Sequence, residues 1–258
     1  MAQAPASPAF EVVSIRPIKP AAPADDLPAL LSRDAVRLIG DHLRATNISA
    51  LALVHAAYKS EFADRDQIVG TDGWITSERF DLEARAGMVL AETPTFPPLP
   101  AAAERMLRQV MEQRFQLRVR RETRALERYV LGYARADRAL RPGIQVAERS
   151  CTDAAMKPDG DCAYRPGAGT FSMKGRPLAE FVDYLSRPAY AGGRVVDETG
   201  ITGPLDIDFE WMLDFRDLLA SRANLTTALR EQLGLKLEHR RLPLPVLVIE
   251  HIQRPSGN

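Results

Sequence analysis

The sequence contains an internal repeat, which limits the folds that the chain can adopt. Three pairs of segments match in the same order, at a separation of about 127 residues: 43–58 with 171–186, 67–73 with 194–200, and 80–83 with 207–210. Later segments correspond as well: 106–117 with 228–237, and 129–133 with 247–251. A period of this length indicates a duplicated domain and not a solenoid of short repeats.

Each copy is predicted to contain the elements β-α-β-β-α-β-β in that order. Helical spacing of apolar residues predicts helices over 49–58, 101–114, 177–186 and 224–233. Strict alternation predicts strands over 79–84 and 206–211, with Phe80 on the buried face and Asp81 in solvent. Two strands are expected to pair at the end of each copy: 116–124 with 128–134, and 235–241 with 245–252.

These elements predict an α+β fold, a tandem duplication of a βαββαββ two-layer domain. The first copy is expected over 37–136 and the second over 170–258. A segment over 1–36 precedes them, with a first strand near 10–16. A linker over 137–169 joins the two copies.

The linker contains the only two cysteines, Cys151 and Cys162. The segment between them is rich in Asp, Gly and Pro, and no histidine lies nearby, so a zinc site is not expected. A disulfide that closes this short loop in an oxidising compartment is the favoured interpretation. Two unrelated surface thiols are the alternative.

Composition and the start of the chain bear on location. Residues 1–8 lack the basic and apolar regions of a signal peptide, but they are typical of what remains after cleavage at an Ala-x-Ala site. We therefore expect a periplasmic or secreted protein; a cytosolic protein is the alternative. No membrane span is expected. Lysine plus arginine and aspartate plus glutamate number 34 each, so no nucleic-acid partner is expected.

The sequence shows no catalytic motif, so we expect neither an enzyme nor a cofactor. The four histidines show no metal-binding spacing, and no metal is expected: His42, His55, His239 and His251. Paired acids at 81/83 and 208/210 are placed by alternation on a solvated sheet face, where they would not act as a catalytic pair.

Charge is unevenly distributed along the chain. Residues 101–141 hold eleven arginines and five acids, and 195–217 hold seven acids and one arginine, which gives net charges of +6 and −6. The two segments could bind each other, bind an outside partner, or form ordinary surface. Aromatic residues near equivalent loops either line a groove or pack over the core. The candidate binding residues are Trp74, Arg118, Arg120, Arg121, Tyr184, Arg194, Asp197 and Trp211.

Three parts of the sequence resemble a known family. Residues 68–74 (IVGTDGW) followed by 79–83 look like the first signature of an uncharacterised soil-associated bacterial envelope family. Residues 194–203 with 209–211 look like the second, and the tail from 228 to 256 is similar too. The resemblance covers 8–258 and departs from the family in the proline-rich segment 93–100. It implies no catalytic activity, so no functional residues are carried over.

The resemblance also implies a context. The family occurs as secreted chains and as a C-terminal extension of antirepressor-type sensor metallopeptidases. The strand order of each copy is similar to the short N-terminal domain of secretins and TonB-dependent transporters, which binds partner proteins in the periplasm. We therefore expect a non-catalytic binding or sensing module at the cell envelope, whose partner is an envelope protein or a small ligand. The alternative is an envelope hydrolase or glycan-binding protein that uses Arg194 and the acidic loop Asp197–Glu198.

Overall fold

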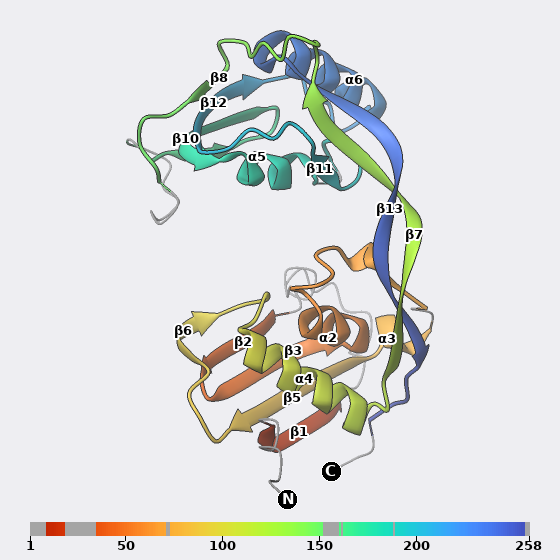
Figure 1. The fold of residues 1–258 in the computed structure, drawn as a ribbon. Coiled ribbons are helices and arrows are strands. Elements are labelled where there is room, and N and C mark those ends of the chain that lie inside the picture. The colour runs from red at the N-terminus through yellow and green to blue at the C-terminus, as the bar shows by residue number, and fades with distance from the viewer. Residues whose placement is uncertain are drawn as a thin grey trace, which may run out of the picture. The chain divides into compact units, whose positions relative to one another are not determined.

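A computed structural model of the chain describes residues 9–18, 35–70, 73–151, 160, 162–187 and 189–255. The chain forms two compact units (Figure 1). Unit 1 consists of Met1–Arg124 together with Leu244–Asn258, and unit 2 consists of Ala125–Pro243. Both units combine helices with β-sheet, which confirms the α+β class. The chain start at 1–8, residues 71–72 of the first signature and part of the predicted linker lie outside the described residues.

Unit 1 contains a five-stranded antiparallel sheet with the order β1-β5-β3-β2-β6. Its strands are β1 (Phe10–Ile18), β2 (Ala35–Gly40), β3 (His42–Ser49), β5 (Arg79–Ala86) and β6 (Ala91–Thr95). Helices α2 (Ala50–Ala57) and α4 (Ala101–Arg114) contact each other and cover one face of the sheet (Figure 1). Three short elements also belong to unit 1: η1 (Arg65–Gln67), β4 (Ile68–Val69) and α3 (Trp74–Ser77).

Local sequence explains where these elements begin and which way they face. Ser49 caps α2, because its Oγ accepts a hydrogen bond from the Ala52 N–H at 3.2 Å. Along β5, buried Phe80 and Leu82 alternate with Asp81 and Glu83 on the opposite face, as predicted. The strand expected near 10–16 and the helix expected over 101–114 are also confirmed.

Unit 2 has a four-stranded antiparallel sheet with the order β8-β12-β10-β9. Its strands are β8 (Ile144–Val146), β9 (Tyr164–Pro166), β10 (Thr170–Pro177) and β12 (Pro204–Glu210). Helix α5 (Leu178–Leu185) follows β10, and helix α6 (Leu218–Ala228) follows β12. A π-helical turn, η2 (Leu229–Leu233), continues α6 and ends at left-handed Gly234. No described helix is long and apolar enough to cross a membrane.

The segment expected to be a linker, 137–169, contributes strands to the second sheet. It contains β8 and β9, the two edge strands, which have only three residues each. Such short strands show no readable alternation, which is why the sequence indicates a linker there. Registers correspond between the sheets: Pro17 faces Phe80 as Ile144 faces Ile207, and Leu38 faces Leu43 as Pro166 faces Phe171.

The closing strands differ from the prediction. Instead of two short pairs there are two long strands, β7 (Arg118–Tyr133) and β13 (Leu235–His251), in a sheet of order β11-β7-β13-β4. The stretches expected to turn, 125–127 and 242–244, contain no Gly, Asn or Asp. A tight hairpin needs residues that accept positive φ, so the chain continues straight through both stretches.

Because these strands continue, each unit is completed by a strand from the other predicted copy. In unit 1, β4 pairs in parallel with the end of β13, with Leu247 opposite Ile68. In unit 2, β11 (Val195–Asp197) pairs in parallel with the end of β7, with Val195 opposite Tyr129. The last strands of the two predicted copies, 129–133 and 247–251, thus each pair with a strand of the other predicted copy. We call them the exchanged strands.

The two cysteines form a disulfide, as predicted, with their Cα atoms 5.5 Å apart. Strands β8 and β9 lie at opposite edges of the unit 2 sheet, and the disulfide closes a loop within the connection between them, residues 147–163, which we call the crossing. The buried Cys151 also donates its N–H to the Gly175 carbonyl at 2.6 Å. Gly175 has φ +65°, and a Cβ atom there would lie 2.9 Å from the Cys151 Sγ.

Removal of this disulfide is expected to weaken unit 2. The double variant C151A/C162A frees the crossing in the unfolded chain, and the free energy of unfolding should fall by about 2–3 kcal/mol. Urea unfolding followed by the fluorescence of Trp211, which lies in unit 2, measures the change. An unchanged midpoint would show that hydrogen bonds alone hold the crossing in place.

Candidate binding groove

Two of the predicted binding residues lie inside unit 2 and not on its surface. Tyr184 and Trp211 are 1% and 8% exposed. They pack edge-to-face, with ring centroids 6.1 Å apart, in an aromatic cluster with Phe171, Phe181, Tyr190 and Phe209. The Tyr184 hydroxyl donates to the carbonyls of Gly167 and Thr170, and burial raises the pKa of its phenol. These side chains stabilise the core, the packing alternative that the sequence left open.

Two of the three arginines proposed on β7, Arg120 and Arg121, take part in ion pairs of unit 1. Arg121 donates to Glu61 Oε2 at 2.8 and 3.1 Å, and Arg120 pairs with Glu122 and with Glu250 of β13. Arg118 is exposed and forms no ion pair with any residue in the described ranges. Most of this group therefore stabilises the fold near the start of β7.

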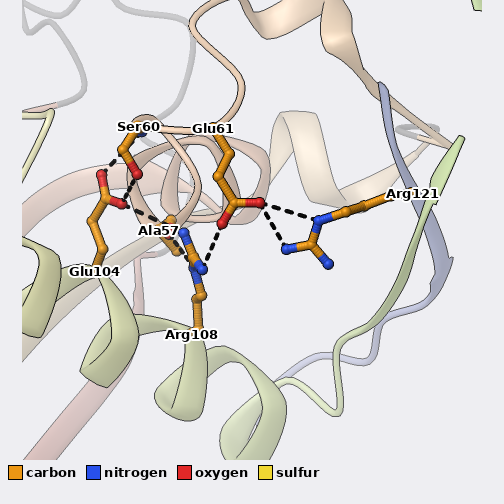
Figure 2. A network of polar contacts seen from close by, with 6 residues as sticks. All are labelled: Ala57, Ser60, Glu61, Glu104, Arg108 and Arg121. Carbon is orange, nitrogen blue, oxygen red and sulfur yellow. Dashed lines mark hydrogen bonds and ion pairs between the residues drawn. The ribbon is translucent and has the colours of Figure 1, made fainter. Parts of the chain in front are cut away.

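Figure 2 shows how Arg121 is held. Glu61 bridges Arg121 and Arg108, whose Nη1 lies 2.7 Å from Glu61 Oε1. Arg108 also donates its Nε–H to the Ala57 carbonyl at 2.7 Å and reaches the buried Glu104 at 3.4 Å. Partial burial alone would raise the pKa of Glu61, but the hydrogen bonds and charges of both arginines outweigh it and lower that pKa. The network joins the end of α2, helix α4 and β7.

Trp74 lies in a second anchored region of unit 1. The Arg254 guanidinium lies 5.3 Å from the centre of the Trp74 ring. The same guanidinium pairs with both carboxylate oxygens of Glu78, at 2.6–3.0 Å. These contacts hold the segment that follows β13 against α3.

Two predicted residues, Arg194 and Asp197, line the same surface depression in unit 2. It lies between α5 and the segment 201–203 and has a volume of about 470 Å³. We call it the α5 groove. Its apolar lining comes from Pro177, Leu178, Ala179, Val182 and Ile201, and its polar lining from Asp183, Arg194, Asp197, Thr202 and Gly203. An apolar floor with a few polar groups is typical of sites that bind ligands or peptides.

The polar groups around the α5 groove have defined contacts. Arg194 Nη1 lies 2.9 Å from Asp183 Oδ1, and the Asp183 side chain is 66% exposed. Asp197 is exposed, and its Oδ1 accepts hydrogen bonds from the N–H and the Oγ1 of Thr199 at 2.8 and 2.7 Å. The neighbouring Glu198 pairs with Arg240. This arrangement supports recognition by charge and shape, with every carboxylate in contact with solvent.

The apolar lining of the α5 groove was not predicted from the sequence. Leu178 and Val182 match the spacing of an amphipathic helix, which does not distinguish a core face from the floor of a groove. The turn Thr-Gly-Ile-Thr-Gly, with positive φ at Gly200 and Gly203, was the one sequence signal for the groove. A turn at this place leaves the side of α5 less covered than a helix would.

His55 lies on α2 and is half-buried. Its Nε2 lies 3.3 Å from the Ala63 carbonyl oxygen, and burial, followed by the charge of Lys59, lowers its pKa to about 4. Within the described ranges, no group of three or more His, Cys, Asp or Glu residues could hold a metal ion.

The low pKa of His55 predicts a pH dependence. Between pH 6.5 and about 4 the unfolded chain binds a proton at His55 that the folded chain does not, so the free energy of unfolding should fall as the pH falls. The variant H55Q should flatten the stability profile in this window. Urea unfolding followed by Trp74 fluorescence at several pH values tests this; parallel profiles for both proteins would contradict it.

The fold and the groove define a two-unit α+β protein with exchanged strands and an open groove on its second unit. The chain belongs to the family described as "Protein of unknown function (DUF3738)", whose sequence profile matches residues 51–252. The match runs from α2 to the end of β13 and confirms the resemblance to an uncharacterised family. No curated protein and no solved structure matches the chain.

Proposed function

We propose that the protein is an exported, non-catalytic binding or sensing module that contacts a protein partner at the cell envelope. The α5 groove carries this proposal, because it joins an apolar floor to charged residues that already take part in ion pairs and hydrogen bonds. The disulfide supports a periplasmic or secreted location.

The resemblance adds finer proposals. The soil-associated family, the link to sensor metallopeptidases and the likeness to the secretin and TonB-type short domain all point to partner binding in the periplasm. We also propose that the chain arose by duplication of one domain, with copies over 37–136 and 170–258. The equivalent strand orders β1-β5-β3-β2 and β8-β12-β10-β9 support this.

A hydrolase at Asp197–Glu198 receives less support. Acid–base catalysis needs one carboxylate whose pKa is raised by burial. Asp197 is exposed and the Glu198 side chain is 49% exposed, and each already accepts a hydrogen bond or an ion pair. The α5 groove therefore favours a binding role.

Site-specific photo-cross-linking in envelope fractions tests the proposed function. A photoreactive phenylalanine analogue at Ala179, an exposed position on the α5 groove, should capture a discrete protein partner. The same analogue at Ala223, an exposed position on α6, is the matched control. The Ala179 adduct should persist in the R118Q variant. No adduct at Ala179, or the same adducts at both positions, would contradict the proposal.

A further inference from the structure

The two units differ in one pair of equivalent three-residue segments, which lie beside α2 in unit 1 and beside α5 in unit 2. Residues 74–76 in unit 1 correspond to 201–203 in unit 2. In unit 1 they form most of α3, which packs against α2. In unit 2 they form no helix, because Gly203 has φ +87° and β12 begins at Pro204. The α5 groove is the open space at this place.

Unit 1 therefore shows what chemistry this place accepts. There, α3 supplies the aromatic ring of Trp74, and the Arg254 guanidinium covers that ring and pairs with Glu78. An aromatic side chain and an arginine thus lie together at α3, the helix that packs against α2. In unit 2 the position of Trp74 is taken by the smaller Ile201.

The charge of the α5 groove favours a similar pair of groups. Its lining contains two carboxylates, those of Asp183 and Asp197, and one guanidinium, that of Arg194. Because Arg194 pairs with Asp183, the remaining charge is the negative charge of Asp197. A cationic side chain is the complement of this charge.

A strand edge beside the groove suits an extended chain. β11 is the edge strand of its sheet, and the Arg194 carbonyl and Glu198 N–H bond inward to β7. The amide groups of Val195 and Asp197 alternate with these and point to the outer edge. The Val195 part of that edge is covered by α5, since Val195 is 1% exposed and its N–H donates to Ser186 Oγ at the end of this helix. The exposed Asp197, which lines the groove, is the part of the edge beside which the main chain of an extended segment would lie.

We propose that the α5 groove binds an extended segment of a partner protein that presents a bulky aromatic side chain near a lysine or arginine. The aromatic ring lies on Leu178, Val182 and Ile201, and the cation lies at Asp197. This inference rests on the proposed function and gives it a partner chemistry.

The experiment uses the full chain labelled with ¹⁵N and the blocked peptide acetyl-Gly-Trp-Gly-Arg-Gly-amide. Titration should shift the amide signals of Thr202 and Gly203. Alanine in place of the peptide's tryptophan should weaken binding more than tenfold, on the order expected for loss of a buried ring. Glutamate in place of its arginine should weaken binding about fivefold or less at low salt.

Three protein variants complete the test. A179W fills the groove from an exposed position and should abolish binding, whereas A223W on α6 should bind like the wild type. D197N should keep the requirement for tryptophan and lose the preference for arginine. Absence of shifts, or equal binding by A179W, would overturn the inference. If the peptide fails while Ala179 still cross-links a partner, the proposed function stands and only the assigned chemistry is wrong.

Discussion

Replacement of Leu247 by alanine is expected to destabilise unit 1, although Leu247 belongs to the second predicted copy. The side chain is fully buried, lies opposite Ile68 and belongs to the core that contains Phe80 and Phe115. A leucine-to-alanine change at such a site costs about 2–5 kcal/mol, because it removes apolar contacts and leaves a cavity. Unfolding in urea, followed by Trp74 fluorescence in a W211F background, measures the loss.

Hydrogen exchange locates the effect of L247A. Amides of β3 and α2 in unit 1 should exchange faster under native conditions, and those of the equivalent β10 and α5 in unit 2 should change less. The L244A variant, at a half-buried position on the same strand, is the matched control and should have a smaller effect. Faster exchange confined to unit 2 would mean that β13 closes the copy from which it comes.

The reciprocal change, Leu131 to alanine, is expected to destabilise unit 2. Leu131 lies on β7 opposite Asp197, is fully buried and packs in the core with Phe171 and Leu235. The free energy of unfolding should again fall by about 2–5 kcal/mol. Trp211 fluorescence in a W74F background reports the change, since Trp211 belongs to the same core.

The two leucine variants are expected to accelerate hydrogen exchange in opposite units. L131A should accelerate exchange in β10 and α5, and L247A should do so in β3 and α2. Closing hairpins within each copy would produce the opposite pattern. A uniform acceleration throughout both units would show that the units unfold as one cooperative body.

Local patterns predicted the elements well, because alternation and helical spacing depend only on neighbours in sequence. The strand 79–84 and the helix 101–114 were readable for this reason. These local patterns could not predict which strand each closing strand would pair with. Ile68–Val69 and Val195–Val196 present similar apolar pairs to the equivalent strands 129–133 and 247–251, so pairing within a copy and exchange between copies satisfy the same pattern.

The charged residues of the α5 groove could be predicted from the sequence, but its apolar floor could not. Arg194 and Asp197 are charged residues in a glycine-containing loop, a pattern that indicates a surface site. Its apolar floor depends on whether a helix or a turn follows Gly200, and that choice is decided by Gly203 and Pro204 together with the packing of α5. Tyr184 and Trp211 were ambiguous, because aromatic residues near loops serve grooves and cores alike.

The exchanged strands have a consequence for biosynthesis. Gln67 donates its side-chain amide to the Pro245 carbonyl across 178 positions, so unit 1 cannot be completed until almost the whole chain has been made. Synthesis proceeds from the N-terminus, and an unfinished chain exposes β4 and the core around it while it waits. A truncated product that lacks the last fifteen residues would leave its first unit open, and proteases or chaperones could recognise it by that exposed core.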